Sequence, residues 1–402
     1  MGNRKFSKNF KLLIAGSYSN NISSNMLMVL FPWIILTMFN SPFLAGLTMS
    51  IADIPLGIAF AMAYYINKVI RKKDLYVLTT GIRALVILST FIVFLYGNKI
   101  FDLFSILVGY FIISWTEDIS GQIGGFWIKK FLSEDQYQKG FSLSSMLSMT
   151  TYLVSYIMAG LFIEIGIDYA FPVLIVGFTI ATFIRSLIKP VSGKVEEEKQ
   201  HNFRDGLTYI WKNKVLRYIM LQSLIFGLAA GGFLLLIESL VKYKYSSSAF
   251  ILTSILIIAM VGGIGGSFLS SKIKWNPRGA MMVMVLIQIP VILFIPFAPS
   301  YLLILPAVFI LMFTNQVHGV FASSTSMKAT PSDYIIITKG AHETLALFPS
   351  VLSGLILGSI IQFVSIDSAF YYVAIMSVGV VLLIYLGKDI GKIKIEEYNK
   401  VV

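Results

Sequence analysis

Long apolar stretches separated by short polar ones dominate the chain. A helix that crosses a membrane needs about 20 apolar residues, and the sequence repeatedly provides runs of that length. The pattern predicts twelve transmembrane helices, near residues 12–39, 42–66, 75–97, 101–128, 140–165, 169–188, 216–241, 248–271, 279–298, 301–327, 335–363 and 368–387. We therefore expect an all-α integral membrane protein.

The longest polar stretch, residues 189–218, separates the predicted helices into two groups of six. It contains the charged run EEEK, which is typical of a solvated linker. Four apolar residues in it recur at helical spacing and predict a short amphipathic helix on the cytoplasmic face: Phe203, Leu207, Ile210 and Trp211. The predicted domains are two pseudo-symmetric six-helix bundles and a cytoplasmic linker, at residues 1–188, 215–402 and 189–214 respectively.

The composition agrees with a membrane protein, because 56% of the residues are hydrophobic and only 13% are charged. The net charge of +12 is concentrated in alternate loops. If the N-terminus is cytoplasmic, the basic residues of the opposite loops are only Lys99, Lys242 and Lys244. The positive-inside rule then predicts a multi-pass protein of the cell membrane with both termini in the cytoplasm. The charge therefore indicates topology rather than binding to nucleic acid.

Several kinds of chemistry lack the residues they need. The chain has no cysteine, which excludes disulfides and thiolate metal sites. It also has no P-loop, helix-borne zinc motif or nucleophile elbow, so we expect neither an enzyme nor an ATP-driven pump, and no cofactor. Methionine-rich runs such as MMVMV are typical of apolar packing, and we expect no metal site.

Acidic residues inside the predicted membrane helices are few. An ionisable side chain at membrane depth is costly and is therefore a candidate for function. Four acids are candidates for proton coupling: Asp53, Glu117, Asp118 and Glu343. Bracing of the helix bundle is the alternative role for these acids. Glu164 and Glu238 fall near outer helix ends, where we expect them to be solvated.

Arg83 lies inside the third predicted helix, in the run TTGIRAL. A guanidinium at that depth needs a partner, and the antiparallel fourth helix brings two acids to a similar level. Adjacent residues on a helix point about 100° apart, so one acid can pair with the arginine while the other faces a cavity. We expect an intramembrane ion pair between Arg83 and one of these two acids, Asp118 or Glu117, and the sequence does not choose between them.

Polar side chains are scattered along four of the predicted helices. Polar groups at membrane depth face protein or water rather than lipid, so these residues predict a water-filled cavity. The candidates for lining it and contacting a substrate are Asn20, Asn21, Asn25, Gln122, Gln222, Asn315, Gln316 and His318.

The loop between the second and third helices carries a cluster of basic residues, in INKVIRKK. Such a cluster is attracted to the anionic cytoplasmic surface. The residues predicted to form a cytoplasmic gate there are Asn67, Lys68, Arg71 and Lys72. The alternative is that the cluster only sets the topology of the chain.

The order and spacing of several motifs resemble the Major Facilitator Superfamily, in the branch that contains macrolide-efflux and enterobactin-exporter-like proteins. The resemblance rests on ADIPLG, the basic loop with its following arginine, FRDGLTYIWKNKVLRYI and ATPSDY. Ala63 and Asn67 replace the glycine and aspartate that this family's loop usually carries. In helix five, SYIMAG replaces the glycine-rich turn of many proton antiporters.

The resemblance implies a secondary transporter that works by alternating access, with its site between the two halves. We expect proton-coupled export of an amphiphilic organic compound, such as a drug or a siderophore-like molecule. We expect the protein to work as a monomer in the lipid bilayer, with protons as the coupling ion. The alternatives are an importer of a small nutrient or metabolite on the same fold, or a non-transporting membrane subunit or receptor.

Overall fold

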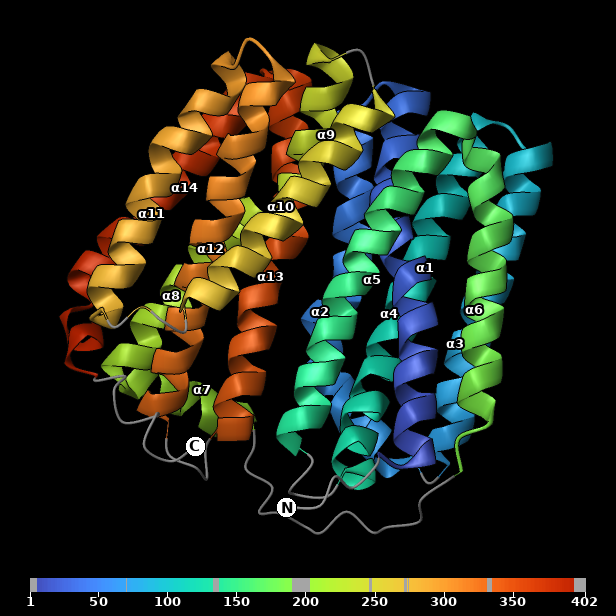
Figure 1. Ribbon diagram of the computed structural model, residues 1–402, viewed down its shortest axis with the longest axis horizontal. Coiled ribbons are helices and arrows are strands. Elements are labelled where there is room, and N and C mark those ends of the chain that lie inside the picture. Colours follow the sequence, from blue (N-terminus) through green and yellow to red (C-terminus); the bar gives the residue numbers. More distant parts are fainter. Residues whose placement is uncertain are drawn as a thin grey trace. The chain divides into compact units, whose positions relative to one another are not determined.

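The computed structural model describes residues 6–69, 71–132, 137–189, 203–245, 248–270, 273, 275–330 and 335–393. Every regular element in these residues is a helix (Figure 1). The elements up to the polar stretch are α1 (Lys8–Phe39), α2 (Pro42–Lys68), α3 (Lys72–Tyr96), α4 (Lys99–Phe131), α5 (Tyr137–Ile165), the 3-10 helix η2 (Ile167–Tyr169) and α6 (Ala170–Ser186).

The second part of the chain is also helical. Its elements are α7 (Phe203–Lys212), α8 (Lys214–Ala230), α9 (Phe233–Lys244), α10 (Ala249–Ser270), α11 (Pro277–Phe294), η3 (Ile295–Phe297), α12 (Tyr301–Ala329), α13 (Ile335–Phe363), α14 (Ile366–Leu386) and η5 (Lys388–Lys392). Eleven stretches of the described residues are long and apolar enough to cross a membrane. The predicted all-α membrane architecture is confirmed. The predicted window 42–66 corresponds to α2, in which the side chains of residues 56–65 lie outside the described part.

The chain divides into two compact units. Unit 1 consists of residues 1–40 and 51–198, and unit 2 of residues 41–50 and 199–402. The first turns of α2 therefore belong to unit 2, whereas the domains predicted from the sequence assign them to the first bundle. The cause is a close contact with α13, in which the Ser50 hydroxyl accepts a hydrogen bond from the Leu355 backbone at 3.1 Å.

Short polar residues start many of the helices. The side chains of Ser7, Asn98, Asn213, Asn276, Ser300 and Ser365 accept hydrogen bonds from backbone N–H groups in the first turns of α1, α4, α8, α11, α12 and α14. Such caps satisfy N–H groups that have no acceptor within the helix. These local signals explain why the observed boundaries lie within a few residues of the predicted ones.

The predicted helix 216–241 is interrupted. It forms α8 and α9, which are separated by Gly231 and Gly232. A Cβ atom on Gly231 would lie 2.9 Å from the Cα of Ser350, so the backbone of α13 leaves no space for a side chain. The N–H of Gly232 is released from the helix and donates to the Ser353 hydroxyl at 2.8 Å.

The predicted amphipathic helix forms as α7. Its residue Ile210 is buried in a cluster with Leu216, Met220 and Ala341, so the apolar face of α7 packs on α8 and α13. Trp211 on the other side remains 47% exposed. The helix is therefore held as part of unit 2.

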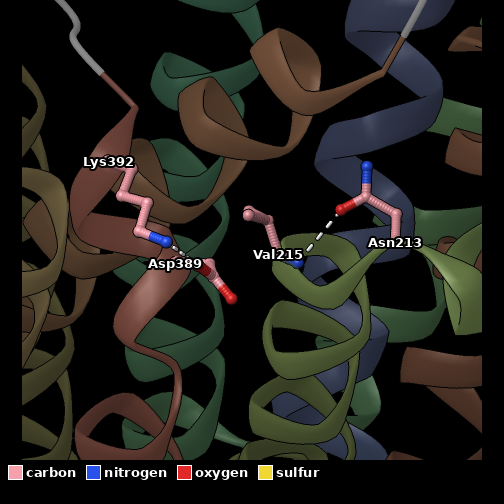
Figure 2. A network of polar contacts seen from close by, with 4 residues as sticks. All are labelled: Asn213, Val215, Asp389 and Lys392. Atoms are coloured by element: carbon pink, nitrogen blue, oxygen red, sulfur yellow. Dashed lines mark hydrogen bonds and ion pairs between the residues drawn. The ribbon is translucent and has the colours of Figure 1, made fainter.

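Two local polar contacts lie at the start of α8 and within η5 (Figure 2). The Asn213 side chain accepts a hydrogen bond from the Val215 N–H at 3.0 Å, and Lys392 pairs with Asp389 at 2.5 Å. The Lys392 ammonium holds the pKa of the exposed Asp389 carboxyl below its usual value. The contribution of this pair to stability is present at neutral pH and is lost as the pH falls through the lowered pKa, and it is small because the pair is exposed.

Glycines allow α10 and α12 to approach each other closely. A Cβ atom on Gly262 would lie 2.5 Å from the carbonyl oxygen of Phe309, and one on Gly266 would lie 2.4 Å from that of Phe313. Gly263, in the same GGIGG run, has no atom of another described helix within 4 Å of such a position. Small residues at helix interfaces are the usual way for membrane helices to gain packing contacts.

We predict that Gly262→Ala lowers the free energy of unfolding by about 1–3 kcal/mol, because the added methyl group overpacks the α10–α12 contact. The matched control is Gly263→Ala on the same helix, which should keep or slightly raise the melting temperature, because alanine favours a helix more than glycine does. Both variants can be compared by thermal unfolding in detergent. Equal effects of the two substitutions would contradict the assignment of Gly262 to the contact.

Candidate functional site

Arg83 in α3 is fully buried in unit 1. Its Nε donates to the Thr116 hydroxyl at 3.0 Å, and one terminal nitrogen donates to the Thr116 carbonyl at 2.5 Å and to the Ser120 hydroxyl at 2.6 Å. The other terminal nitrogen donates to the side-chain oxygen of Asn20. Neutral acceptors on α1 and α4 therefore hold this guanidinium.

Asn20 connects the guanidinium to an acid. Its amide nitrogen donates to Glu117 Oε1 at 3.4 Å and to the side-chain oxygen of Asn21 at 3.3 Å. The Asn20 side chain is buried, so its amide is fixed between the cation and the carboxylate. Arg83 and Glu117 thus belong to one network without direct contact.

The structure does not contain the predicted ion pair between Arg83 and Asp118. Asp118 accepts a hydrogen bond from Gln122 at 3.0 Å, one turn further along α4. Thr116 and Ser120 occupy the face of α4 that meets α3, and residue 118 projects about 160° away from them on an ideal helix. No carboxylate lies within 4.0 Å of the Arg83 nitrogens in the described part of unit 1.

Asp53 lies on α2 in unit 1, two residues before Pro55. Its side chain is half-buried, and within the described residues it has no hydrogen bond or ion pair.

The other polar candidates of unit 1 lie on α1 and α4. Asn25 on α1 donates to the Thr151 hydroxyl of α5 at 3.3 Å. Unit 1 therefore brings Asn20, Asn21 and Glu117 together, and places Asp118 with Gln122 nearby on α4.

A second buried guanidinium, Arg185 in α6, was not among the predicted site residues. It donates to the Thr80 hydroxyl, and its Cζ lies 4.1 Å from the centre of the Tyr76 ring. Its Nε has no partner in the part of the chain that is described. In the sequence Arg185 falls at a helix end beside a basic stretch, and it therefore counts as one more residue that sets the topology.

Unit 2 contains buried polar side chains that have no hydrogen-bond partner in its described part. Both polar atoms of Gln222 on α8 and Nε2 of His318 on α12 are buried, and none has a partner among the described residues. The imidazole stacks on Phe226, with ring centres 6.1 Å apart, and Phe226 lies one turn beyond Gln222 on α8. Asn315 and Gln316 are half-buried on the same helix as His318.

Glu343 is part of α13, but its side chain lies outside the described residues. The neighbouring His342 contacts the Ser223 hydroxyl at 3.1 Å, so α13 and α8 are linked by a polar contact at this level. The role predicted for Glu343 in proton coupling stays a prediction.

The prediction that Glu238 is solvated is wrong. The side chain is fully buried in α9, and neither carboxyl oxygen has a hydrogen-bond partner in the described part of the protein. All residues from Leu235 to Val241 are buried, because α10, α13 and α14 pack around this helix. A charged residue near the end of an apolar run is typical of a solvated helix end, so the sequence does not reveal this burial.

The basic loop is described only in part. The side chains of Asn67 and Lys68 lie outside the described residues. Arg71 lies 3.8 Å from Asp74 in an exposed ion pair, and Lys72 donates to the Val69 carbonyl at 2.9 Å. The cytoplasmic gate at Asn67, Lys68, Arg71 and Lys72 stays a prediction.

Comparison with known proteins identifies the family. Residues 13–344 match the sequence profile of the Major Facilitator Superfamily. The chain belongs to this superfamily. A curated relative, the uncharacterised MFS-type transporter YkuC of Bacillus subtilis, is 28% identical over 167 residues, which are 37% of this chain and 39% of the relative. The exporter branch suggested by the sequence is not established by these matches.

Solved structures of several transporters have the same fold. The nucleoside transporter NupG superposes with a TM-score of 0.73 and 14% identity, over 96% of this chain and all of that one. The POT family transporter PepTSo gives a TM-score of 0.71 and 12% identity, over 96% and 98% of the two chains. A bacterial homologue of the iron transporter ferroportin gives 0.70 and 11%, over 96% and 99%. At these identities the likeness concerns the fold alone.

We predict that Arg83→Lys lowers the free energy of unfolding by about 2–4 kcal/mol. A lysine ammonium cannot reproduce the planar fork of donors, so the acceptors on Asn20, Thr116 and Ser120 lose their partner while buried. The control is Arg71→Lys, whose side chain is 85% exposed and which should change stability by less than about 0.5 kcal/mol. Denaturant unfolding in detergent measures the free energy of unfolding of both variants. Equal values for the two would contradict the stabilising role of the hydrogen bonds made by Arg83.

We also predict that Glu238→Met raises the free energy of unfolding by about 1–3 kcal/mol. Methionine has a similar length and removes a buried polar group that has no described partner. The exposed Glu164→Met is the control and should be neutral. A fall in the melting temperature of Glu238→Met would show that the carboxyl group has an essential partner.

Proposed function

We propose that this superfamily member is a monomeric, proton-coupled transporter that works by alternating access and exports an amphiphilic organic compound. The observation that carries the proposal is the neutral coordination of Arg83. Its hydrogen bonds go to amide, hydroxyl and carbonyl oxygens, so none of the acids in unit 1 is needed to satisfy the guanidinium.

This arrangement leaves the acids able to exchange protons. Removing one partner of a buried ion pair typically costs 3–5 kcal/mol, which would hinder protonation of an acid that was directly paired with Arg83. Glu117 is instead linked to Arg83 through the Asn20 amide, and Asp118 contacts only the neutral Gln122 among the described residues. Either carboxyl group can therefore gain or lose a proton without breaking a salt bridge.

The proposed substrate class follows from the groups in unit 2. The amide of Gln222 and Nε2 of His318 are buried without hydrogen-bond partners among the described residues, and buried polar groups normally have such partners. Phe226 provides an aromatic ring beside the imidazole. A ligand with a polar part for the amide and imidazole and an apolar part for the ring would satisfy both kinds of group.

Import of a small nutrient or metabolite is the alternative direction on the same fold, and a non-transporting subunit or receptor is the alternative outside transport. The solved structure of a nucleoside transporter with this fold makes a polar metabolite a reasonable test compound. The direction of transport can be determined separately from proton coupling. Substrate uptake is compared between right-side-out and inside-out vesicles under an imposed proton gradient.

We predict that purified protein in detergent releases or takes up protons when it binds a substrate from a panel of lipophilic cations, siderophores, sugars and nucleosides. The conservative variants Asp53→Asn, Glu117→Gln and Asp118→Asn should reduce the proton signal, and at least one should abolish it while binding persists. The exposed Glu164→Gln is the control. If the triple variant keeps both the signal and its pH dependence, proton coupling by these acids is wrong.

A further inference from the structure

We propose that unit 1 has a specific site for an anionic phospholipid, formed where α1 begins and α6 ends. The phosphate group would lie in a basic cavity and an acyl chain would lie along the outer face of α6. This proposal does not rest on the transport mechanism proposed above. It rests on the shape of the cavity, its charge and the apolar surface that leads to it.

The cavity has a volume of about 370 Å³ and is lined by residues from three segments of unit 1: Ser7, Lys8, Asn9, Phe131, Leu187 and Lys189. Hydrogen bonds join these segments. The Ser7 hydroxyl donates to the Phe131 carbonyl at 3.2 Å, and the Asn9 side chain exchanges two hydrogen bonds with the backbone of Lys189, at 3.1 and 3.2 Å. The walls of the cavity are therefore fixed by contacts between segments far apart in the sequence.

The lining of the cavity is positively charged. Lys8 and Lys189 are exposed, and neither has an ion-pair partner among the described residues. None of the lining residues is acidic. The first residues of α1 add the positive end of a helix dipole, because the Ser7 cap accepts only the N–H of Phe10 and leaves the N–H groups of Lys8 and Asn9 without an acceptor in the helix. Two ammonium groups beside a helix N-terminus are complementary to a phosphate.

An apolar stripe on α6 leads to this cavity. The exposed residues on this face recur at intervals of three and four, and each is 37–64% exposed: Val173, Val176, Ile180, Phe183 and Leu187. The fifteen residues from Val173 to Leu187 span about 21 Å of helix, which exceeds the roughly 15 Å thickness of half a bilayer core. Leu187 belongs both to the stripe and to the lining of the cavity.

The basic cavity and the apolar stripe meet at Leu187, which distinguishes this site from a basic surface in general. A free phosphate would use only the cavity, whereas a phospholipid would use the cavity and the stripe together. The positive-inside pattern predicts that this end of unit 1 faces the cytoplasmic leaflet, whose anionic lipids are attracted by basic residues. A free phosphate and a phospholipid headgroup present the same phosphate group to the cavity. The experiment therefore has to distinguish binding of the lipid from binding of the free anion.

The experiment compares lipid retention by purified full-length protein, measured by native mass spectrometry from micelles that contain equal amounts of phosphatidylglycerol and phosphatidylcholine. The test variant is Lys8→Gln with Lys189→Gln. The control is Lys11→Gln with Lys99→Gln, which removes the same number of exposed charges from unit 1, one near the start of α1 and one at the start of α4, both outside the cavity. A third variant, Ile180→Ser with Phe183→Ser, leaves the lysines intact and makes the stripe polar.

We expect the wild type and the control to retain phosphatidylglycerol in preference to phosphatidylcholine. The Lys8 and Lys189 variant should bind phosphatidylglycerol about thirtyfold more weakly, since each basic residue near an anionic surface contributes about fivefold. The stripe variant should also bind this lipid more weakly, yet bind inorganic phosphate as the wild type does. All variants should keep the wild-type melting temperature in lipid-free detergent, because the substituted side chains are exposed.

Three outcomes would overturn the proposal. Equal losses in the test and control variants would mean that total surface charge attracts the lipid. No preference of the wild type for phosphatidylglycerol would mean that the cavity does not recognise the headgroup. Binding of inorganic phosphate by the wild type, with lipid retention unaffected by the stripe variant, would assign the cavity to a free anion.

Discussion

A polar group within a membrane has no water to bond with and must find its partners in the protein. This constraint makes every described regular element of the chain a helix, because a helix satisfies its own backbone groups. It acts most strongly on Arg83, whose guanidinium is both charged and fully buried. Asn20, Thr116 and Ser120 are placed so that the guanidinium bonds to all three, which ties α1, α3 and α4 together in unit 1.

Satisfying the arginine with neutral oxygens has a consequence for the acids around it. A direct ion pair would hold Glu117 or Asp118 in the ionised state, whereas the observed bonds connect one acid to the arginine only through Asn20 and the other to Gln122. Arg185 adds a second buried positive charge, which contacts the hydroxyl of Thr80 and the ring of Tyr76. Unit 1 therefore contains two buried guanidinium groups bonded to neutral acceptors, and two membrane acids, Glu117 and Asp118, that form no ion pair within the described residues.

Unit 2 meets the same constraint in another way. Its helices approach closely at glycines, as at Gly262 against Phe309 and at Gly232, whose N–H is satisfied by Ser353 after the helix breaks. Its buried polar side chains at Gln222, His318 and Glu238 lack partners among the described residues. In a medium where an unsatisfied polar group is costly, such groups are where a ligand, a proton or water is expected.

The sequence by itself determined the class of fold and the place of nearly every helix. The apolar period and length of each run decide this locally, and the predicted helix 335–363 coincides with α13. It also identified Arg83 and the polar residues of α1, α4, α8 and α12 as candidates, because polar side chains stand out in apolar runs. Only the tertiary structure decided which of them meet. Arg83 bonds to Asn20 rather than to Asp118, the window 216–241 breaks where α13 comes close, and Glu238 is enclosed by three helices, because contacts between residues distant in the sequence depend on how the helices pack.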